Sequence, residues 1–428
     1  MDMRVYVETY GCWLNKAESG VAERLLRARG AEIVDTPEAA DVVVVNTCAV
    51  RGDTERRMLK RIEELEGLRR RAGFRLVVTG CLVNVRPRTI LSLAPEASLV
   101  EPDALEEIAD IVYSGGQVFR LRGYRGGRSV MPEYRGGPVY VVPVETGCLG
   151  ACAFCIAGVA RGRGVKSYRP GLIVDAVRDA VRRGAKEVYL TGQDVAAYGV
   201  DLGVTLADLL ERILGEVEGE YRIRLGMMEP ALLARMLPRL LEVVRDERVY
   251  RYFHVPVQSG SDRVLRLMRR RYTVGEYRRI IGSIRGALGR VSVATDLIVG
   301  FPGEGEEDFQ RSIELIEDLR FDKVHVARYT LRPFTAGYVM KGVPEPVKKR
   351  RSRVASEVSL RVAYEVNKGY VGLEREVVVD DISMRGDPVG RTIEYKPVVL
   401  KEDVEIGEVV RVRITGATPL ALEGRVVG

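Results

Sequence analysis

Three closely spaced cysteines constrain this chain more than any other feature. Cys148, Cys152 and Cys155 have the spacing C-x3-C-x2-C and follow a β-branched run over residues 139–144. Such a run predicts a buried strand, so the cysteines are expected on the loop beyond its carboxyl end. A loop folded this tightly can direct three thiolates to one point. Three thiolates fill three corners of an iron–sulfur cube and leave its fourth iron open to another ligand.

A zinc site is the alternative interpretation of three neighbouring cysteines. A structural zinc ion takes four protein ligands, and the fourth is usually another cysteine or a histidine. The chain contains only two histidines, His254 and His325, and both lie far along the sequence from this loop. The missing fourth ligand therefore favours the iron–sulfur cluster.

The composition is that of a globular protein with more than one domain. The 428 residues are 46% hydrophobic and 30% charged, which leaves room for two or three domains with ample cores. No apolar run approaches the length of a membrane span, and the first residues predict a strand rather than a signal peptide, so we expect a cytoplasmic protein with no membrane partner. The net charge of +7 permits an anionic partner without identifying one.

The N-terminal region predicts an open α/β fold with a parallel sheet. Strands are expected at residues 4–9, 41–46 and 76–79, and helices at 16–29 and 54–71. A cysteine follows each strand: Cys12, Cys48 and Cys81. Since the carboxyl ends of parallel strands share one edge of the sheet, these thiols should converge there. We interpret them as three ligands of a second iron–sulfur cluster; the alternative is three unrelated buried thiols.

The rest of the chain divides into a linker and two further domains. Residues 113–137 are rich in glycine and arginine and predict a linker. Strands then alternate with helices up to about residue 335, in at least six β/α units that would form a full or partial barrel with polar residues at the carboxyl ends of its strands. From about residue 371, short strands predict a small antiparallel β-barrel, a module that often binds oligonucleotides; a capping or dimerisation domain is the alternative. The predicted domains are residues 1–125, 138–365 and 368–428.

Two other patterns fail as active-site motifs. Residues 162–167 resemble the end of a phosphate-binding loop but lack the glycine directly before the lysine. His254 and His325 lie in segments that predict strands, so we interpret them as core or edge residues rather than catalytic bases. No Ser/His/Asp arrangement can be argued from this sequence.

Taken together, these features resemble the radical-SAM methylthiotransferases, which use S-adenosylmethionine (SAM), and the resemblance covers essentially the whole chain. It rests on the loop cysteines, on Tyr10-Gly11-Cys12, Asn46-Thr47-Cys48 and Thr79-Gly80-Cys81, on the segments 254–261 and 296–304, and on a C-terminal region similar to the RNA-binding TRAM domain. Residues 160–164 and 190–199 look most like the archaeal and eukaryotic tRNA branch.

The resemblance implies two [4Fe–4S] clusters and SAM as cofactors. It implies that SAM binds the open iron at the loop cysteines and that the second cluster holds the methylthio group. Further SAM contacts are expected at Gly192, Gln193, Asp194, Glu229 and Gln258. Many radical-SAM enzymes carry Gly-Gly-Glu after the second barrel strand, so Gly192-Gln193-Asp194 is a departure that leaves the holder of the SAM amino group open.

The implied reaction converts N6-threonylcarbamoyladenosine beside the anticodon of tRNA to its 2-methylthio form. The target is an aromatic C–H bond that acid–base catalysis cannot open, so a radical cofactor is required. The implied partners are the tRNA anticodon stem-loop, an electron donor and a sulfur source. The alternatives are methylthiolation of isopentenyladenosine in tRNA or of a ribosomal-protein aspartate, and, in a different class, a non-catalytic iron–sulfur electron carrier.

Overall fold

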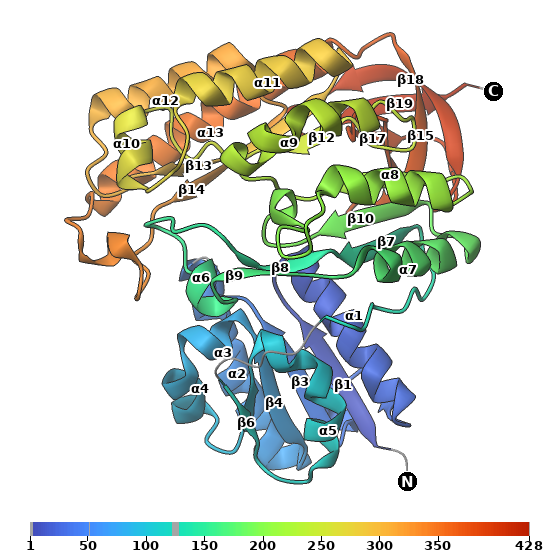
Figure 1. Ribbon diagram of the computed structural model, residues 1–428, viewed down its shortest axis with the longest axis vertical. Coiled ribbons are helices and arrows are strands. Elements are labelled where there is room, and N and C mark those ends of the chain that lie inside the picture. The colour runs from blue at the N-terminus through green and yellow to red at the C-terminus, as the bar shows by residue number, and fades with distance from the viewer. Residues whose placement is uncertain (1–2, 51, 122–127, 428) are drawn as a thin grey trace.

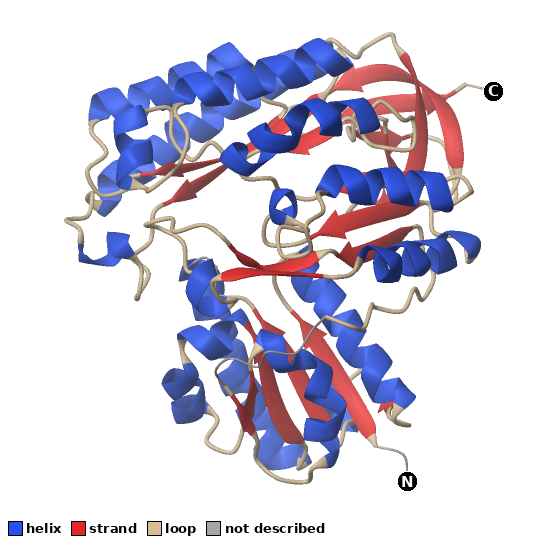
Figure 2. Ribbon diagram, viewed as in Figure 1, coloured by secondary structure: helices blue, strands red, loops and turns tan. Residues whose placement is uncertain are grey.

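The computed structural model describes residues 3–50, 52–121 and 128–427, and two of its three regions stack along the longest axis of the molecule (Figure 1). The N-terminal region is at one end. The central β/α region is at the other end, and the C-terminal β-barrel lies beside it, not beyond it along this axis (Figure 2). Within the described residues, no helix has the length and apolar character needed to cross a membrane.

The N-terminal region is the predicted open α/β fold, built on a six-stranded parallel sheet with the order β2-β1-β3-β4-β5-β6. Its strands are β1 (Arg4–Thr9), β2 (Glu32–Ile33), β3 (Val42–Thr47), β4 (Arg75–Gly80), β5 (Ser98–Val100) and β6 (Phe119–Arg120). Its helices are α1 (Trp13–Ala28), α2 (Gly52–Ala72), α3 (Cys81–Val85), α4 (Pro87–Leu93) and α5 (Ile108–Tyr113), with short 3-10 turns η1 (Pro37–Ala39) and η2 (Pro102–Glu107). Every residue of β3 is buried, as its valine run requires, because helices cover both faces of the sheet.

The predicted linker is wrong over part of its length. Residues 119–120 form β6 and pair with β5 at the edge of the N-terminal sheet. Further along, Met131 and Tyr134 are buried against the central region, and Tyr140 donates a hydrogen bond to the Pro132 carbonyl at 2.6 Å. The sequence misleads here because glycine and arginine dominate the composition while the few apolar residues carry the packing. The glycines at 123, 126 and 127 lie outside the described residues.

The central region is a partial barrel of parallel strands. Its strands are β7 (Val139–Pro143), β10 (Glu187–Thr191), β11 (Arg222–Leu225), β12 (Tyr252–His254), β13 (Ser292–Val299) and β14 (Lys323–Arg328). Its helices are α7 (Pro170–Arg182), α8 (Leu206–Glu216), α9 (Pro230–Val243), α10 (Asp262–Leu267), α11 (Val274–Leu288), α12 (Glu306–Leu319) and α13 (Glu345–Lys368), with 3-10 turns η3 (Val195–Ala197) and η4 (Ala336–Val339). Strands β7, β10 and β11 form one sheet and β12, β13 and β14 another; single bridges such as Met227 to His254 join the two.

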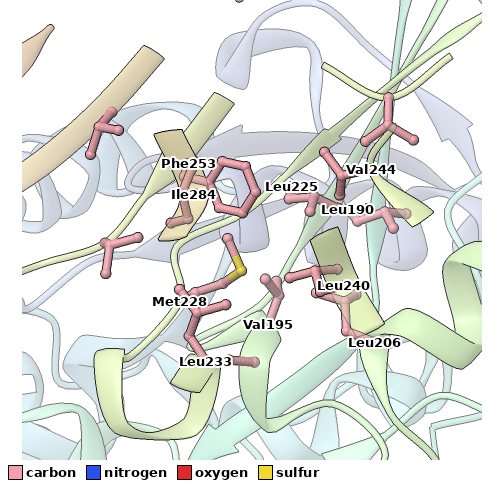
Figure 3. Packing of buried hydrophobic residues seen from close by; sticks show 14 of the residues in the cluster. Leu190, Val195, Leu206, Leu225, Met228, Leu233, Leu240, Val244, Phe253 and Ile284 are labelled. Atoms are coloured by element: carbon pink, nitrogen blue, oxygen red, sulfur yellow. The ribbon is translucent and has the colours of Figure 1, made fainter. Parts of the chain in front are cut away.

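The core of this barrel lies between its strands and the surrounding helices. Figure 3 shows Leu225 and Phe253 from two neighbouring strands packed with Leu240 of α9 and Ile284 of α11, and all four are buried. The amphipathic periodicity of the helices places such residues on one face. This packing fixes the carboxyl ends of the strands, where the polar residues lie.

One hairpin was not predicted. After β7, the chain forms β8 (Glu145–Cys148), which pairs in antiparallel fashion with β9 (Gly164–Ser167), and the short helix α6 (Ala157–Ala160) lies between them. Cys148 therefore ends the first strand of a hairpin, Cys152 and Cys155 lie in its connection, and none of the three lies directly beyond the strand over residues 139–144. A Cβ atom at Gly147 would lie 2.0 Å from the Gly164 carbonyl oxygen, so the close pairing of these strands requires glycine.

The C-terminal region is a closed β-barrel with the order β15-β16-β17-β19-β18. Its strands are β15 (Glu374–Ile382), β16 (Pro388–Arg391), β17 (Pro397–Leu400), β18 (Val409–Ala417) and β19 (Leu422–Val426). The prediction of an antiparallel barrel holds except for β17 and β19, which pair in parallel. It docks on the central barrel through Lys396, whose Nζ lies 2.5 Å from Asp322 Oδ1, and through Arg251, whose N–H donates to the Ile393 carbonyl at 2.8 Å.

Candidate active site

The three loop cysteines share one small cavity, and each sulfur has a hydrogen-bond donor. The Gly150 N–H donates to Cys148 Sγ at 3.2 Å, the Ala157 N–H to Cys155 Sγ at 3.4 Å, and Arg270 Nη1 to Cys152 Sγ at 3.2 Å. These donors stabilise thiolates over thiols. The sequence therefore places three sulfurs around one point, as its spacing predicted.

The donor set of this cavity fits an iron–sulfur cluster. Burial raises the pKa of Cys148 to about 11 and that of Cys155 to about 12, and a bound metal would supply the positive charge that favours their thiolates. Among the described residues that line the cavity there is no histidine and no fourth cysteine. Three thiolates with an open fourth position match a cube with one free iron better than a four-ligand zinc site.

The strand-following cysteines also come together. They lie just beyond β1, β3 and β4, at the shared edge of the N-terminal sheet. Burial raises the pKa of Cys81 to about 11; the Arg161 guanidinium opposes this shift, and the neighbouring thiols of Cys48 and Cys12 add to it. Cys48 and Cys81 are buried whereas Cys12 is exposed. Trp13, directly after Cys12, contacts Tyr189 of the central barrel edge-on, with 5.1 Å between the ring centroids, so this triad faces the barrel.

Arg161 contacts the strand-following triad and was not predicted as a site residue. It follows α6, close in sequence to the loop cysteines, yet its Nε donates to Cys81 Sγ at 3.1 Å. Its other nitrogens bind Asn15 Oδ1 at 2.8 Å and the Glu18 carboxylate, and the residue is 3% exposed. The contact spans eighty positions in sequence, so no local pattern could have predicted it.

A chain of carboxylates extends from the loop cysteines along the strand ends. Asp194, predicted as a SAM contact, accepts the Glu229 N–H at 2.9 Å, and its own N–H donates to Glu145 Oε1 at 2.8 Å. Arg270 Nη2 lies 3.4 Å from Glu229 Oε1 and so joins this chain to Cys152. Burial raises the pKa of Asp194 to about 7 and that of Glu145 well above its usual value. These groups can hold an ammonium group close to the cysteine loop.

Glu145 is a site residue that the sequence did not reveal. Its side chain is fully buried, and Oε2 has no hydrogen-bond partner within the described residues. A lone glutamate after a strand carries no motif, so only the structure shows that it supports Gly192 and Asp194.

Gly192 is where a single methyl group should disturb this arrangement. A Cβ atom there would lie 2.0 Å from Glu145 Oε1 and 2.8 Å from its carboxyl carbon. We expect Gly192→Ala to displace Glu145, to cost about 1–3 kcal/mol of unfolding free energy as overpacking does, and to weaken SAM binding. Thermal denaturation and equilibrium dialysis with labelled SAM measure the two effects. Gly215→Ala is the matched control, because nothing within 4 Å meets its added Cβ; equal losses in both variants would contradict the prediction.

The main cavity, of about 600 Å³, lies between the N-terminal region and the strand ends of the barrel. Its walls include Val50 just after Cys48, and Cys155 of the loop triad, so it reaches both cysteine sites. Gln258, another predicted SAM contact, lines it with a left-handed φ of 69° and a buried Oε1 that lacks a hydrogen-bond partner in the described chain. A strained, unsatisfied polar residue at a cavity wall is typical of a ligand-binding position.

The two histidines lie beside this cavity. His254 Nε2 is 3.0 Å from Asp296 Oδ1 on the neighbouring strand β13, and the interpretation of the histidines as core or edge residues stays a prediction. His325 lies in the cavity wall, and burial lowers its pKa to about 4, which keeps the imidazole neutral.

Arg332 is a second wall residue that the sequence did not indicate. It is 3% exposed, and one nitrogen pairs with the Glu55 carboxylate of α2. Glu55 also binds Arg86 Nε at 2.8 Å, so one negative charge serves two guanidinium groups. Nε and Nη2 of Arg332 have no hydrogen-bond partner among the described residues. At this wall, two guanidinium nitrogens therefore keep hydrogen-bond donor capacity that no described residue uses, and Arg332 shares the single charge of Glu55 with Arg86.

Comparison with known proteins places this geometry in a family. Three family profiles match in succession: the uncharacterized protein family UPF0004 over residues 4–101, the radical SAM superfamily over 142–316, and the TRAM domain over 368–427. A protein of Pyrococcus horikoshii named probable threonylcarbamoyladenosine tRNA methylthiotransferase is 37% identical over 99% of this chain and 100% of its own length. The chain belongs to the radical-SAM methylthiotransferases.

Relatives within the radical-SAM methylthiotransferases carry two kinds of name. A Methanothermobacter thermautotrophicus protein with the same name as the Pyrococcus relative is 39% identical over 97% of this chain and 98% of its own. A Chloroflexus aurantiacus protein named tRNA-2-methylthio-N(6)-dimethylallyladenosine synthase is 36% identical over 99% of this chain and 91% of its own. Among solved structures, the radical SAM methyltransferase TsrM from Kitasatospora setae matches 79% of this chain and 74% of its own with a TM-score of 0.60 at 14% identity, which shows the shared fold.

Membership in the radical-SAM methylthiotransferases makes this protein an enzyme. It also implies a [4Fe–4S] cluster and SAM as cofactors. The three-part fold predicted from the sequence is confirmed, and each profile falls on one of its regions.

Proposed function

We propose that this enzyme converts N6-threonylcarbamoyladenosine beside the anticodon of tRNA to its 2-methylthio form. The observation that carries the proposal is the main cavity, which touches Cys155 of one triad and the segment after Cys48 of the other. A reaction that joins SAM chemistry to sulfur insertion needs both centres at one substrate atom. The names of the archaeal relatives support threonylcarbamoyladenosine as the substrate.

The two triads take different roles in this proposal. Cys148, Cys152 and Cys155 hold the [4Fe–4S] cluster that binds SAM, and Cys12, Cys48 and Cys81 hold a second [4Fe–4S] cluster that carries the methylthio group. When bound, these cofactors supply an electron for SAM cleavage, the radical that opens an unactivated C–H bond, and the sulfur to be inserted. An electron donor and a sulfur source are therefore required as partners.

The chain's own residues bind and orient the reactants. Asp194 and Glu229 provide carboxylates for the amino group of SAM beside Cys152. The backbone of Gly192 and Gln193 lies next to these carboxylates and contacts SAM as well. Gln258 at the cavity wall provides a further contact to SAM through Oε1, which has no hydrogen-bond partner among the described residues.

The substrate base has its own walls in this cavity. Phe154, Ile298 and Tyr329 supply apolar surface that excludes water from an adenine. Arg332 donates from Nε and Nη2, its two nitrogens without a partner among the described residues, to acceptors of the bound nucleotide. An adenosine must leave the base stack to enter, and unpaired anticodon-loop bases do this at low cost.

The decisive experiment uses anaerobically reconstituted enzyme with SAM, a strong reductant and a sulfide source. Stem-loops carrying threonylcarbamoyladenosine or isopentenyladenosine are treated, digested and weighed by mass spectrometry. A methylthio mass gain on the threonylcarbamoyl nucleoside alone is the expected result. A gain on the isopentenyl nucleoside instead would assign the enzyme to the other tRNA substrate. Deoxyadenosine without either gain would indicate a protein substrate, and no deoxyadenosine would indicate the electron carrier.

The outer face of the C-terminal barrel should bind tRNA phosphates. Arg411 and Arg413 on β18 are exposed, and Arg425 on β19 is the direct cross-strand neighbour of Arg413. We expect the triple change to glutamine to weaken tRNA binding and to flatten the slope of log K against log salt by roughly 0.9 for each phosphate that the protein no longer neutralises. Fluorescence anisotropy across a salt series measures both.

A charge-matched control separates this face from general basicity. Arg235, Arg279 and Arg353 lie on helices of the central region and can be changed to glutamine together. The same loss of affinity and slope in both triple variants would contradict a phosphate-binding role for the barrel face.

A further inference from the structure

The turn that follows β14 carries a phenylalanine where the backbone conformation favours glycine. The Thr335 N–H donates to the Arg332 carbonyl at 3.4 Å, Pro333 takes the second position, and Phe334 takes the third with φ of 65°. This is the arrangement of a type II turn, whose third position has a left-handed φ and usually holds glycine or asparagine. A bulky residue there is strained.

Packing does not offset this strain. Phe334 is 71% exposed, so its ring gains little from burial. The turn itself is held in place: the Gly337 N–H donates to the Ala153 carbonyl at 2.7 Å, and a Cβ at Gly337 would lie 2.4 Å from Tyr329 Oη. An exposed aromatic ring kept in a costly conformation on a fixed turn points to a role outside folding.

The surroundings of the ring define that role. Phe334 borders the cavity of the three loop cysteines together with Arg163 and Arg269, which are both exposed. In Figure 1 this segment, next to η4, projects from the central barrel on the same side as α6. The site thus presents one apolar ring and two cations at the edge of the loop-cysteine cavity.

We propose that Phe334 is a stacking platform for an unpaired RNA base that neighbours the reacting adenosine, with Arg163 and Arg269 contacting the flanking phosphates. This inference rests on the proposed function, since it assumes an RNA substrate. Aromatic rings and guanidinium planes bind splayed bases by stacking, and nearby cations follow the phosphate chain. The two positive charges complement RNA, and the ring lies too close to the cysteine loop to contact a distant part of the stem.

The test compares Phe334→Gly, Phe334→Trp and wild type as full-length, anaerobically reconstituted enzyme. Glycine adopts a positive φ freely, so the thermal midpoint of Phe334→Gly should equal or exceed that of wild type. Its affinity for the threonylcarbamoyladenosine stem-loop, measured by anisotropy, should fall by about 5-fold to 150-fold, the range found when a stacking ring is removed. Phe334→Trp should retain wild-type affinity. Phe119→Ala, which removes an exposed ring from β6, should leave the affinity unchanged.

Several outcomes would overturn the inference. Wild-type RNA affinity in Phe334→Gly would exclude stacking, and a lower thermal midpoint with loss of iron would assign Phe334 a structural role. Unchanged RNA affinity combined with slower turnover from a protein reductant, but not from dithionite, would make this surface a docking site for an electron-transfer protein. Failure of the proposed function would give a different result. Wild type would bind the stem-loop more tightly than Phe334→Gly does, but it would produce no methylthio nucleoside.

Discussion

Cys148→Ala is expected to abolish reductive cleavage of SAM. The loop triad supplies three sulfurs to one cavity, and no other cysteine or histidine among the described lining residues can replace a lost ligand. Since SAM needs an open iron on an intact cluster, two thiolates are insufficient. Release of 5′-deoxyadenosine under a strong reductant should fall to background, and Cys152→Ala and Cys155→Ala should behave alike.

Iron analysis separates loss of a cofactor from loss of the fold. Cys148→Ala should lose the iron and sulfide of the loop cluster and keep those of the second cluster. It should still unfold in one cooperative thermal transition. Leu149→Ala changes a neighbour in the same loop that is not a ligand and should retain SAM cleavage. Deoxyadenosine formation by Cys148→Ala at the wild-type rate would show that SAM binds elsewhere, and zinc in place of iron in the wild-type loop would revive the zinc interpretation.

The sequence predicted the parts of this site that depend on local patterns. Four consecutive valines in β3 can only be a strand covered on both faces, so the position of Cys48 at its end followed directly. Parallel topology then brought Cys12 and Cys81 to the same edge. The placement of Asp194 and Gln258 near the carboxyl ends of barrel strands also follows from the sequence, whereas their role as SAM contacts stays a prediction that the resemblance implies.

The missed features depend on contacts between distant segments. Strand β8 was not predicted because Glu-Thr-Gly-Cys has little strand propensity and pairs only through the close approach at Gly147. Strands β16 and β19 contain proline or glycine, which weakened their signal. Arg161 lies in a segment that resembles one branch of the family, but that resemblance assigns it no contact, and only the tertiary fold brings Arg161 to Cys81 and Arg332 to Glu55.

Cys12→Ala should separate the two halves of the reaction. We expect SAM cleavage to remain and methylthiolation of tRNA to stop, because the loop triad and the strand-end triad lie on different elements, on two sides of the main cavity. Cys12 is the best position for this test. It is exposed, whereas Cys48 and Cys81 are buried, so its replacement removes a ligand with little loss of core packing.

The measurement follows both products in one reaction with the threonylcarbamoyladenosine stem-loop. Deoxyadenosine should form at a rate close to that of wild type, while the methylthio nucleoside disappears and the electron paramagnetic resonance spectrum retains the signal of the loop cluster. Cys48→Ala and Cys81→Ala should show the same division, with lower thermal midpoints because their side chains are buried. If Cys12→Ala loses both products in proportion, the second triad is needed for SAM chemistry itself and the division of roles is wrong. If Cys12→Ala keeps both products, the second triad does not hold the methylthio group. That group must then reach the adenosine by another route.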